Sequence, residues 1–116
     1  MNQMKSILAV ALLAMATSAQ AQQVRTAKVA PCTGLQAPDI AAQVKRDFLQ
    51  NRITRWDADK KQLGTDKPIA WVNPDAIVSK DDVWQLPLTV RGSKLDKIYR
   101  VTLNCKSGEI SYTAPQ

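Results

Sequence analysis

The stretch Trp84-Gln85-Leu86-Pro87-Leu88-Thr89-Val90 decides the fold of this 116-residue chain. Large apolar side chains occupy every second position, which is the pattern of a strand with one buried face. The same alternation returns over Tyr99–Cys105, and Ser107-Gly108 then predicts a turn into a last strand, Glu109–Thr113. Strands that follow one another so closely pair as an antiparallel meander. Pro87 favours an edge position or a bulge in the first of them.

One long helix is predicted upstream, from Pro38 to about Trp56. Proline fits the first helical turn, and Asp39 beside it complements the helix dipole. The apolar positions fall on two sides of this helix, Ile40, Ala41, Val44 and Phe48 on one and Leu49, Ile53 and Trp56 on the other. Such a broad stripe predicts a helix that buries two faces or bends near Asn51. A short strand, Ile69–Val72, is predicted after it.

These elements predict an α+β fold, in which one main helix packs on a three- to four-stranded antiparallel sheet. The mature chain is short enough to form one domain with a modest core. Residues 22–31 are polar and show no periodicity, so we expect a flexible leader there, ahead of a single domain over residues 32–116.

Residues 1–21 have the features of a cleaved secretory signal peptide. Lys5 gives a positively charged start, Ile7–Met15 is an apolar run, and Ala19-Gln20-Ala21 is a small-x-small cleavage site. The apolar run is far shorter than the roughly 20 residues of a membrane-spanning helix. We therefore expect export, cleavage after Ala21 and no stable membrane insertion. An uncleaved N-terminal anchor is the alternative.

Cys32 and Cys105 are the two cysteines of the chain, and export would carry them into an oxidising compartment. Cys105 shares a strand face with Tyr99, so its sulfur is predicted to point into the core. Closing so long a loop stabilises a fold by about 4 kcal/mol when chain entropy dominates. A redox pair or a metal site fits poorly, because the chain has no Cys-x-x-Cys motif and no histidine. We expect a single structural disulfide.

The composition argues against catalysis. Without histidine, the chain lacks Ser-His-Asp and Cys-His arrangements and imidazole metal sites. Carboxylates such as Asp47, Asp57, Asp81 and Asp82 lie in stretches typical of a solvated helix face or a turn, and there is no glycine-rich phosphate loop. We therefore expect no enzymatic activity, no cofactor, no catalytic or metal-binding residues and no small-molecule substrate.

Basic and aromatic residues near the end of the predicted helix are candidates for contact with a partner. They are Lys45, Arg46, Arg52, Arg55 and Trp56. A tryptophan beside arginines is typical of protein interface hot spots, although ordinary solvated surface is the alternative for each residue. The formal net charge is +6, falling to +5 once Lys5 is removed, and this charge favours encounters with anionic surfaces. Acidic residues interrupt the basic ones, so we expect no nucleic-acid partner.

Several short motifs in combination resemble the YebF family of enterobacterial secreted proteins. The motifs are Lys45–Arg52 (KRDFLQNR) with Arg55-Trp56, Gln62-Leu63-Gly64, Ile69–Val72 (IAWV) and Asp81–Gly92 (DDVWQLPLTVRG). The resemblance extends from Cys32 to about Tyr112, and Cys32 and Cys105 match the cysteine pair of the family. The family shares its domain with the colicin M immunity protein, a periplasmic inhibitor.

The resemblance implies a protein without enzymatic activity that crosses the inner membrane through the general secretion machinery. It further implies passage from the periplasm to the extracellular medium through outer-membrane porins. The alternative is a periplasmic immunity or inhibitor protein related to the colicin M immunity protein. A shared domain does not fix a partner surface, so protection against colicin M is not carried over to this chain.

Overall fold

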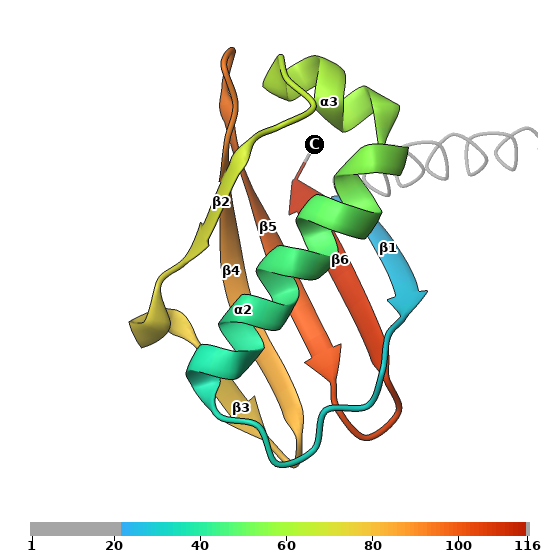
Figure 1. Cartoon of the computed structure of the whole chain (residues 1–116), viewed down its shortest axis with the longest axis vertical. Helices are drawn as coiled ribbons and strands as arrows, with labels where there is room; N and C mark the ends of the chain where they lie inside the picture. Colours follow the sequence, from blue (N-terminus) through green and yellow to red (C-terminus); the bar gives the residue numbers. More distant parts are fainter. Residues whose placement is uncertain (1–21, 116) are drawn as a thin grey trace, which may run out of the picture.

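The computed structural model describes residues 22–115. The predicted signal peptide, residues 1–21, lies outside the described residues. A six-stranded antiparallel sheet, in the order β1-β6-β5-β4-β2 with β3 also paired to β4, carries a helical layer on one face (Figure 1). The predicted α+β fold with one main helix is confirmed. The predicted strand count of three to four is wrong, because two further short or polar strands join the edges.

The strands are β1 (Gln22–Lys28), β2 (Ile69–Val72), β3 (Val78–Lys80), β4 (Val83–Arg91), β5 (Asp96–Asn104) and β6 (Glu109–Pro115). The helical elements are α2 (Ala37–Asp47), a π-helical turn η1 (Phe48–Arg52), a 3-10 turn η2 (Ile53–Arg55), α3 (Asp57–Leu63) and a 3-10 turn η3 (Pro74–Ala76). None of the helices within residues 22–115 is long and apolar enough to cross a bilayer.

Strands β4, β5 and β6 form the predicted meander. Leu86 pairs with Val101 and Leu88 with Tyr99, and all four side chains are buried beneath the helical layer. Pro87 does not mark an edge strand, because β4 has neighbours on both sides. On the side away from β5, however, β2 reaches only Leu88 and β3 only Gln85. Pro87 therefore lies in a gap, where a missing N–H interrupts no ladder.

Strand β1 occupies the stretch that the sequence predicts to be the first part of a flexible leader. It pairs with β6 along its whole length, from Gln22 opposite Pro115 to Lys28 opposite Glu109. The prediction of a leader is therefore wrong for residues 22–28. The sequence shows no strand pattern here because the inward-facing residue at the centre of β1 is the cation Arg25, and not an apolar residue. Its guanidinium pairs with the buried carboxylate of Asp59.

The long helix predicted to reach Trp56 ends as a regular α-helix at Asp47. Ile40, Val44 and Phe48 are fully buried at helical spacing. The next buried residue is Ile53, whose N–H donates to the carbonyl of Phe48, five residues earlier. A π-helical turn of this kind brings Ile53 back onto the buried face. It is the irregularity that the broad apolar stripe predicts near Asn51.

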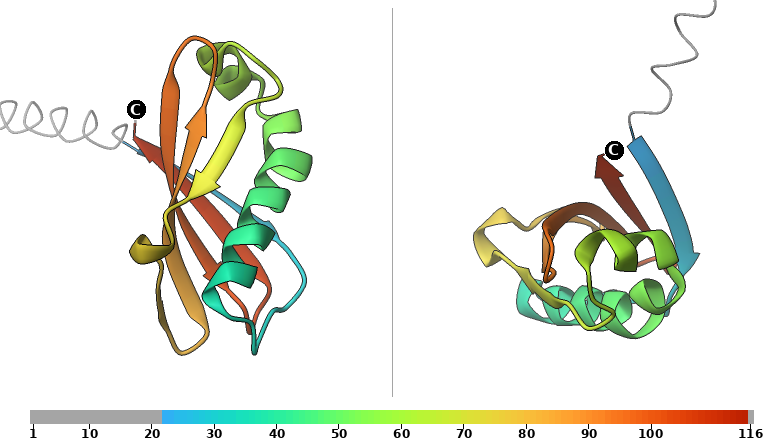
Figure 2. Two further views of the ribbon diagram at one scale, coloured as in Figure 1. Left: turned by 60° about the vertical axis from the view of Figure 1, so that its left-hand side comes forward. Right: turned by 90° about the horizontal axis from the view of Figure 1, so that it is seen from above.

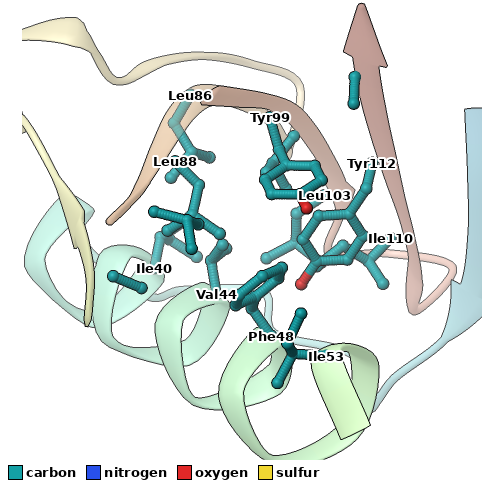
Figure 3. Close-up of a cluster of buried hydrophobic side chains, with 14 of the residues drawn as sticks. Ile40, Val44, Phe48, Ile53, Leu86, Leu88, Tyr99, Leu103, Ile110 and Tyr112 are labelled. Carbon is teal, nitrogen blue, oxygen red and sulfur yellow. The ribbon is translucent and has the colours of Figure 1, made fainter. Parts of the chain in front are cut away.

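The core lies between the helical layer and the sheet. Figure 3 shows Val44, Phe48 and Ile53 pointing at side chains of the strands, with the rings of Tyr99 and Tyr112 between the two layers. The predicted disulfide is present: Cys32 and Cys105 are bonded and buried. The bridge ties the segment before α2 to the end of β5, and the Cys32 N–H also donates to the carbonyl of Cys105.

Candidate functional site

Two buried carboxylates connect the helical layer to the sheet. The first is Asp47, at the end of α2. Its Oδ2 accepts hydrogen bonds from the Tyr112 hydroxyl at 2.7 Å and from Arg52 Nε at 2.9 Å. Its Oδ1 accepts from Arg52 Nη2 at 3.0 Å and from Asn51 Nδ2 at 3.1 Å. Arg52 ends the π-helical turn, five residues after Asp47, and the two side chains are in direct contact.

The second carboxylate, Asp59 of α3, has the same kinds of partner. Its Oδ2 accepts from the Tyr99 hydroxyl at 2.6 Å and from Arg25 Nη1 at 3.1 Å, and its Oδ1 accepts from Arg25 Nη2 at 2.8 Å. Each carboxylate thus receives one tyrosine hydroxyl from the sheet and one arginine fork. Arg25 belongs to β1, so this group joins the N-terminal strand to α3.

Burial alone would raise the pKa of both carboxyl groups. For Asp47 the hydrogen bonds from Arg52 and Tyr112 outweigh burial and hold the pKa below its usual value. For Asp59 the bonds from Arg25 and Tyr99 have the same effect on the pKa. Both groups are ionised at neutral pH, and each carboxylate oxygen accepts at least one hydrogen bond. They are suited to holding the two layers together.

Asp47 was expected on a solvated helix face, and that expectation is wrong: the residue is only 6% exposed. Asp59 was not singled out from the sequence at all. A carboxylate on a charged helical segment resembles solvated surface. What distinguishes these two residues is their partners, Tyr112 and Tyr99, which lie far away in the sequence. No local pattern carries that information.

The five predicted contact residues do not form one surface. Trp56 packs against the rings of Phe48, Tyr99 and Tyr112, and the Arg25 guanidinium carbon lies 4.1 Å from the centre of its ring. Trp56 is therefore half-buried, with the Arg25 side chain of β1 over its ring. Arg52 is committed to Asp47. Lys45 is half-buried on α2, while Arg46 and Arg55 are exposed.

Arg46 and Arg52 line an open cleft of about 530 Å³ between the segment after β1 and the helix. One wall is formed by residues 28–33 and Leu35, and the other by side chains of α2 and η1. The helical wall consists of Gln43, Arg46, Asp47, Gln50, Asn51 and Arg52. Lys45, Arg55 and Trp56 are not among the lining residues. Lys28 does line the cleft, but the sequence does not single it out because it falls in the predicted leader.

Among the described residues, neither α2 nor α3 covers the other face of the sheet. Figure 2 shows α2 and α3 on the same side of the sheet. On the open side, register places Trp71, Thr89 and Ile98 in one row across β2, β4 and β5. Ile98 is 57% exposed, and Trp71 is 38% exposed with the Arg91 guanidinium carbon 5.3 Å from the centre of its ring. This arrangement places two large apolar side chains, Trp71 and Ile98, on the same face as the cation Arg91.

Within residues 22–115, no three acidic or cysteine side chains are grouped so that they could hold a metal ion. Two surfaces of the described residues are open to solvent, the basic cleft and the sheet face that bears Trp71 and Ile98. The buried Tyr112–Asp47–Arg52 group stabilises the helical wall of the cleft, because Asp47 and Arg52 also line the cleft.

Comparison with known proteins supplies the family. The model of the family described as "YebF-like protein" matches residues 25–113. The chain is 59% identical over 107 residues to "Protein YebF" of Yersinia pseudotuberculosis strain IP 31758 and to that of Yersinia pestis, covering 92% of this chain and 79% of each relative. It is 51% identical over 96 residues to "Protein YebF" of Photorhabdus laumondii, covering 83% of this chain and 77% of the relative. The chain therefore belongs to the YebF family, as its motifs predict.

Proposed function

We propose that this chain is a small protein without enzymatic activity that is exported to the periplasm and released into the medium. The Cys32–Cys105 bridge is the observation that carries the proposal, because structural disulfides form and persist in oxidising compartments. Residues 1–21 supply the signal for the general secretion machinery. Outer-membrane porins are the proposed route from periplasm to medium.

Charge supports an encounter with a porin. The chain is basic, and three of the predicted contact residues on the helix, Lys45, Arg46 and Arg55, form no ion pair with a residue in 22–115. Cations on a compact surface are attracted to acidic pore linings, and this attraction weakens as salt is added. Arg52 has a different role, since its guanidinium is bonded to the buried Asp47.

The export route is tested by fractionating cells that express the untagged chain. Medium, periplasm and membranes are compared beside a periplasmic leakage marker, and each fraction is run on a non-reducing gel. We expect oxidised, signal-free protein in the medium of wild-type cells and accumulation in the periplasm of cells without porins. Equal release by both strains would refute the porin route, and retention of the protein in the periplasm of wild-type cells would refute secretion.

The role of the helix charges is tested with the variant Lys45→Glu, Arg46→Glu, Arg55→Glu. Arg52 is left unchanged because reversing it would place two carboxylates together under the sheet. We expect less protein in the medium and more in the periplasm, with an unchanged far-UV circular dichroism spectrum. The matched control reverses three exposed lysines away from the helix, Lys67, Lys80 and Lys106. An equal export defect in this control would show that only the total charge matters.

A second candidate function is that of a periplasmic inhibitor of the immunity type. The open sheet face favours it, since Trp71 and Ile98 beside Arg91 have the composition of a protein interface. The test is survival of colicin M-sensitive cells that overproduce the chain. Protection that is lost in the Trp71→Ala variant would support this function, and sensitivity despite abundant folded protein in the periplasm would remove it.

A further inference from the structure

The cleft between residues 28–35 and the helix carries more positive than negative charge. Lys28, Arg46 and Arg52 line it, and Asp47 is the one acidic side chain among its lining residues. Asp47 is buried and already accepts four hydrogen bonds, from Tyr112, Arg52 and Asn51. The charge of Asp47 is thus compensated by Arg52, whereas Lys28 and Arg46 take part in no ion pair with a residue in 22–115.

Arg52 is held in place at the back of the cleft. Asp47 binds its Nε and Nη2, which leaves Nη1 without a partner among the described residues. A guanidinium that is already oriented loses little side-chain entropy when it donates a further hydrogen bond to a ligand. Arg46 is exposed and free to reach a ligand. The cleft therefore combines one fixed cation with two adaptable ones.

The two walls of the cleft differ in chemistry. The wall formed by residues 28–33 and Leu35 combines the apolar residues Val29, Pro31 and Leu35 with the cation Lys28. The helical wall contributes the amide side chains of Gln43 and Gln50 beside its arginines. An amide side chain both donates and accepts hydrogen bonds, as a peptide backbone does, whereas the charged oxygens of a phosphate group only accept. The lining is therefore better matched to a peptide than to a phosphate.

We propose that this cleft binds an extended acidic segment of another protein. Carboxylates of the segment pair with Arg46 and Lys28, its backbone hydrogen-bonds to Gln43 and Gln50, and its apolar side chains lie against Leu35. The volume of about 530 Å³ falls within the range of ligand sites, and the open shape suits a segment that enters and leaves at the ends. The proposal does not depend on the route of export, since any protein with such a segment would fit.

The test uses ¹⁵N-labelled protein purified in its oxidised form from the periplasm of cells expressing the full-length chain. The probes are a short synthetic peptide of alternating glutamate and leucine, sodium phosphate, and phosphatidylglycerol vesicles. We expect the peptide to shift the amide resonances of Val29, Leu35, Arg46 and Gln50, with a saturable dependence on concentration. Neither phosphate nor vesicles at matched charge should reproduce this set of shifts.

Variants then locate the charges that matter. Lys28→Glu with Arg46→Glu should weaken peptide binding at least about tenfold, since each cation would lose a charge-assisted hydrogen bond. Lys28→Gln with Arg46→Gln, which creates no repulsion, should weaken binding in the same direction. The matched control, Arg55→Glu with Lys61→Glu, reverses two exposed cations that do not line the cleft and should change the affinity by less than about twofold.

Three results would overturn the proposal. The first is an equal loss of affinity in the control pair, which would mean attraction to total charge. The second is a set of peptide-induced shifts centred outside the cleft. The third is a full response of the cleft to phosphate or to vesicles, which would assign it to a phosphate ligand or a membrane surface. The folded state of each variant is checked beforehand by its dispersed amide spectrum.

Discussion

At the scale of single residues, two carboxylates are buried at little net cost because their partners are complete. An unpaired charge in a protein interior is strongly destabilising, while a charge with an arginine fork and a hydroxyl donor is compensated. Asp47 joins η1 to β6 through Arg52 and Tyr112, and Asp59 joins α3 to β5 through Tyr99. These polar groups connect the helical layer to the sheet beside the apolar core.

Removing Arg52 should show how much its ion pair with Asp47 contributes to the free energy of unfolding. We expect Arg52→Ala to lower the free energy of unfolding by about 2–4 kcal/mol, because Asp47 would stay buried with its charge only partly compensated. Urea unfolding followed by circular dichroism measures the change. Arg55→Ala, at an exposed position in the next turn, should stay within about 0.5 kcal/mol of wild type. Equal effects of the two substitutions would contradict the assignment.

The tyrosines predict the response to alkali. Burial raises the pKa of Tyr112 and of Tyr99 in the folded chain, and the neighbouring carboxylates raise it further. Unfolded tyrosine ionises near pH 10, so the folded state loses stability as the pH rises above about 10. These are the chain's two tyrosines. Tyrosinate absorbance should therefore appear together with the loss of circular dichroism, and tyrosinate in a still-folded protein would be the contrary result.

At the scale of elements, periodicity predicts what is apolar and regular. Trp84–Val90 and Tyr99–Cys105 alternate because β4 and β5 have one face in the core and one in solvent, and both strands were found from that pattern. Strand β1 could not be found in this way. Its apolar residues Val24 and Ala27 point to opposite faces, and its central inward residue is Arg25.

The candidate site was predictable only in part for the same reason. Arg46 and Arg52 were identified as contact residues from their types and spacing, and both line the cleft. Lys28 becomes part of the cleft through β1, which the sequence does not reveal. Trp56 is predicted to contact a partner, and the structure places the Arg25 side chain of β1 over its half-buried ring, which the sequence does not reveal. In each case the missing information is a contact between residues distant in the sequence.

The π-helical turn η1 predicts that the fold tolerates deletion of one residue within it. Deleting Gln50, an exposed residue of η1, would place Ile53 four residues after Phe48, which is the spacing of a regular α-helix on the same buried face. We expect the deletion to change the free energy of unfolding by no more than about 1 kcal/mol.

The control deletes Ala42, an exposed residue of α2, and rotates Ile40 away from Val44. It should cost about 3 kcal/mol or more, because a fully buried side chain loses its site. The measurement compares the urea unfolding midpoints of the two deletion variants with that of the wild type. A Gln50 deletion as damaging as the Ala42 deletion would mean that the turn is needed for more than register.

At the scale of the whole molecule, stability depends strongly on the Cys32–Cys105 bridge, which spans 73 positions of the sequence. For a small domain, about 4 kcal/mol from loop closure is a large share of the total. We expect reduction to lower the urea midpoint by an amount of this order, measured with and without dithiothreitol. The double variant Cys32→Ala, Cys105→Ala should behave like the reduced protein, and an unchanged midpoint would contradict the prediction.

Topologically, the bridge turns the chain into a covalent ring with two tails, and the tails are β1 and β6. Only residues 29–31 separate β1 from Cys32, and only residues 106–108 separate Cys105 from β6. Along the path through the disulfide, the two strands are thus joined by a short connection like that of a hairpin, although they lie at opposite ends of the described sequence. This short cut lowers the entropic cost of pairing them by about 2 kcal/mol. We therefore expect β1 to pair less stably with β6 in the reduced chain than in the oxidised chain.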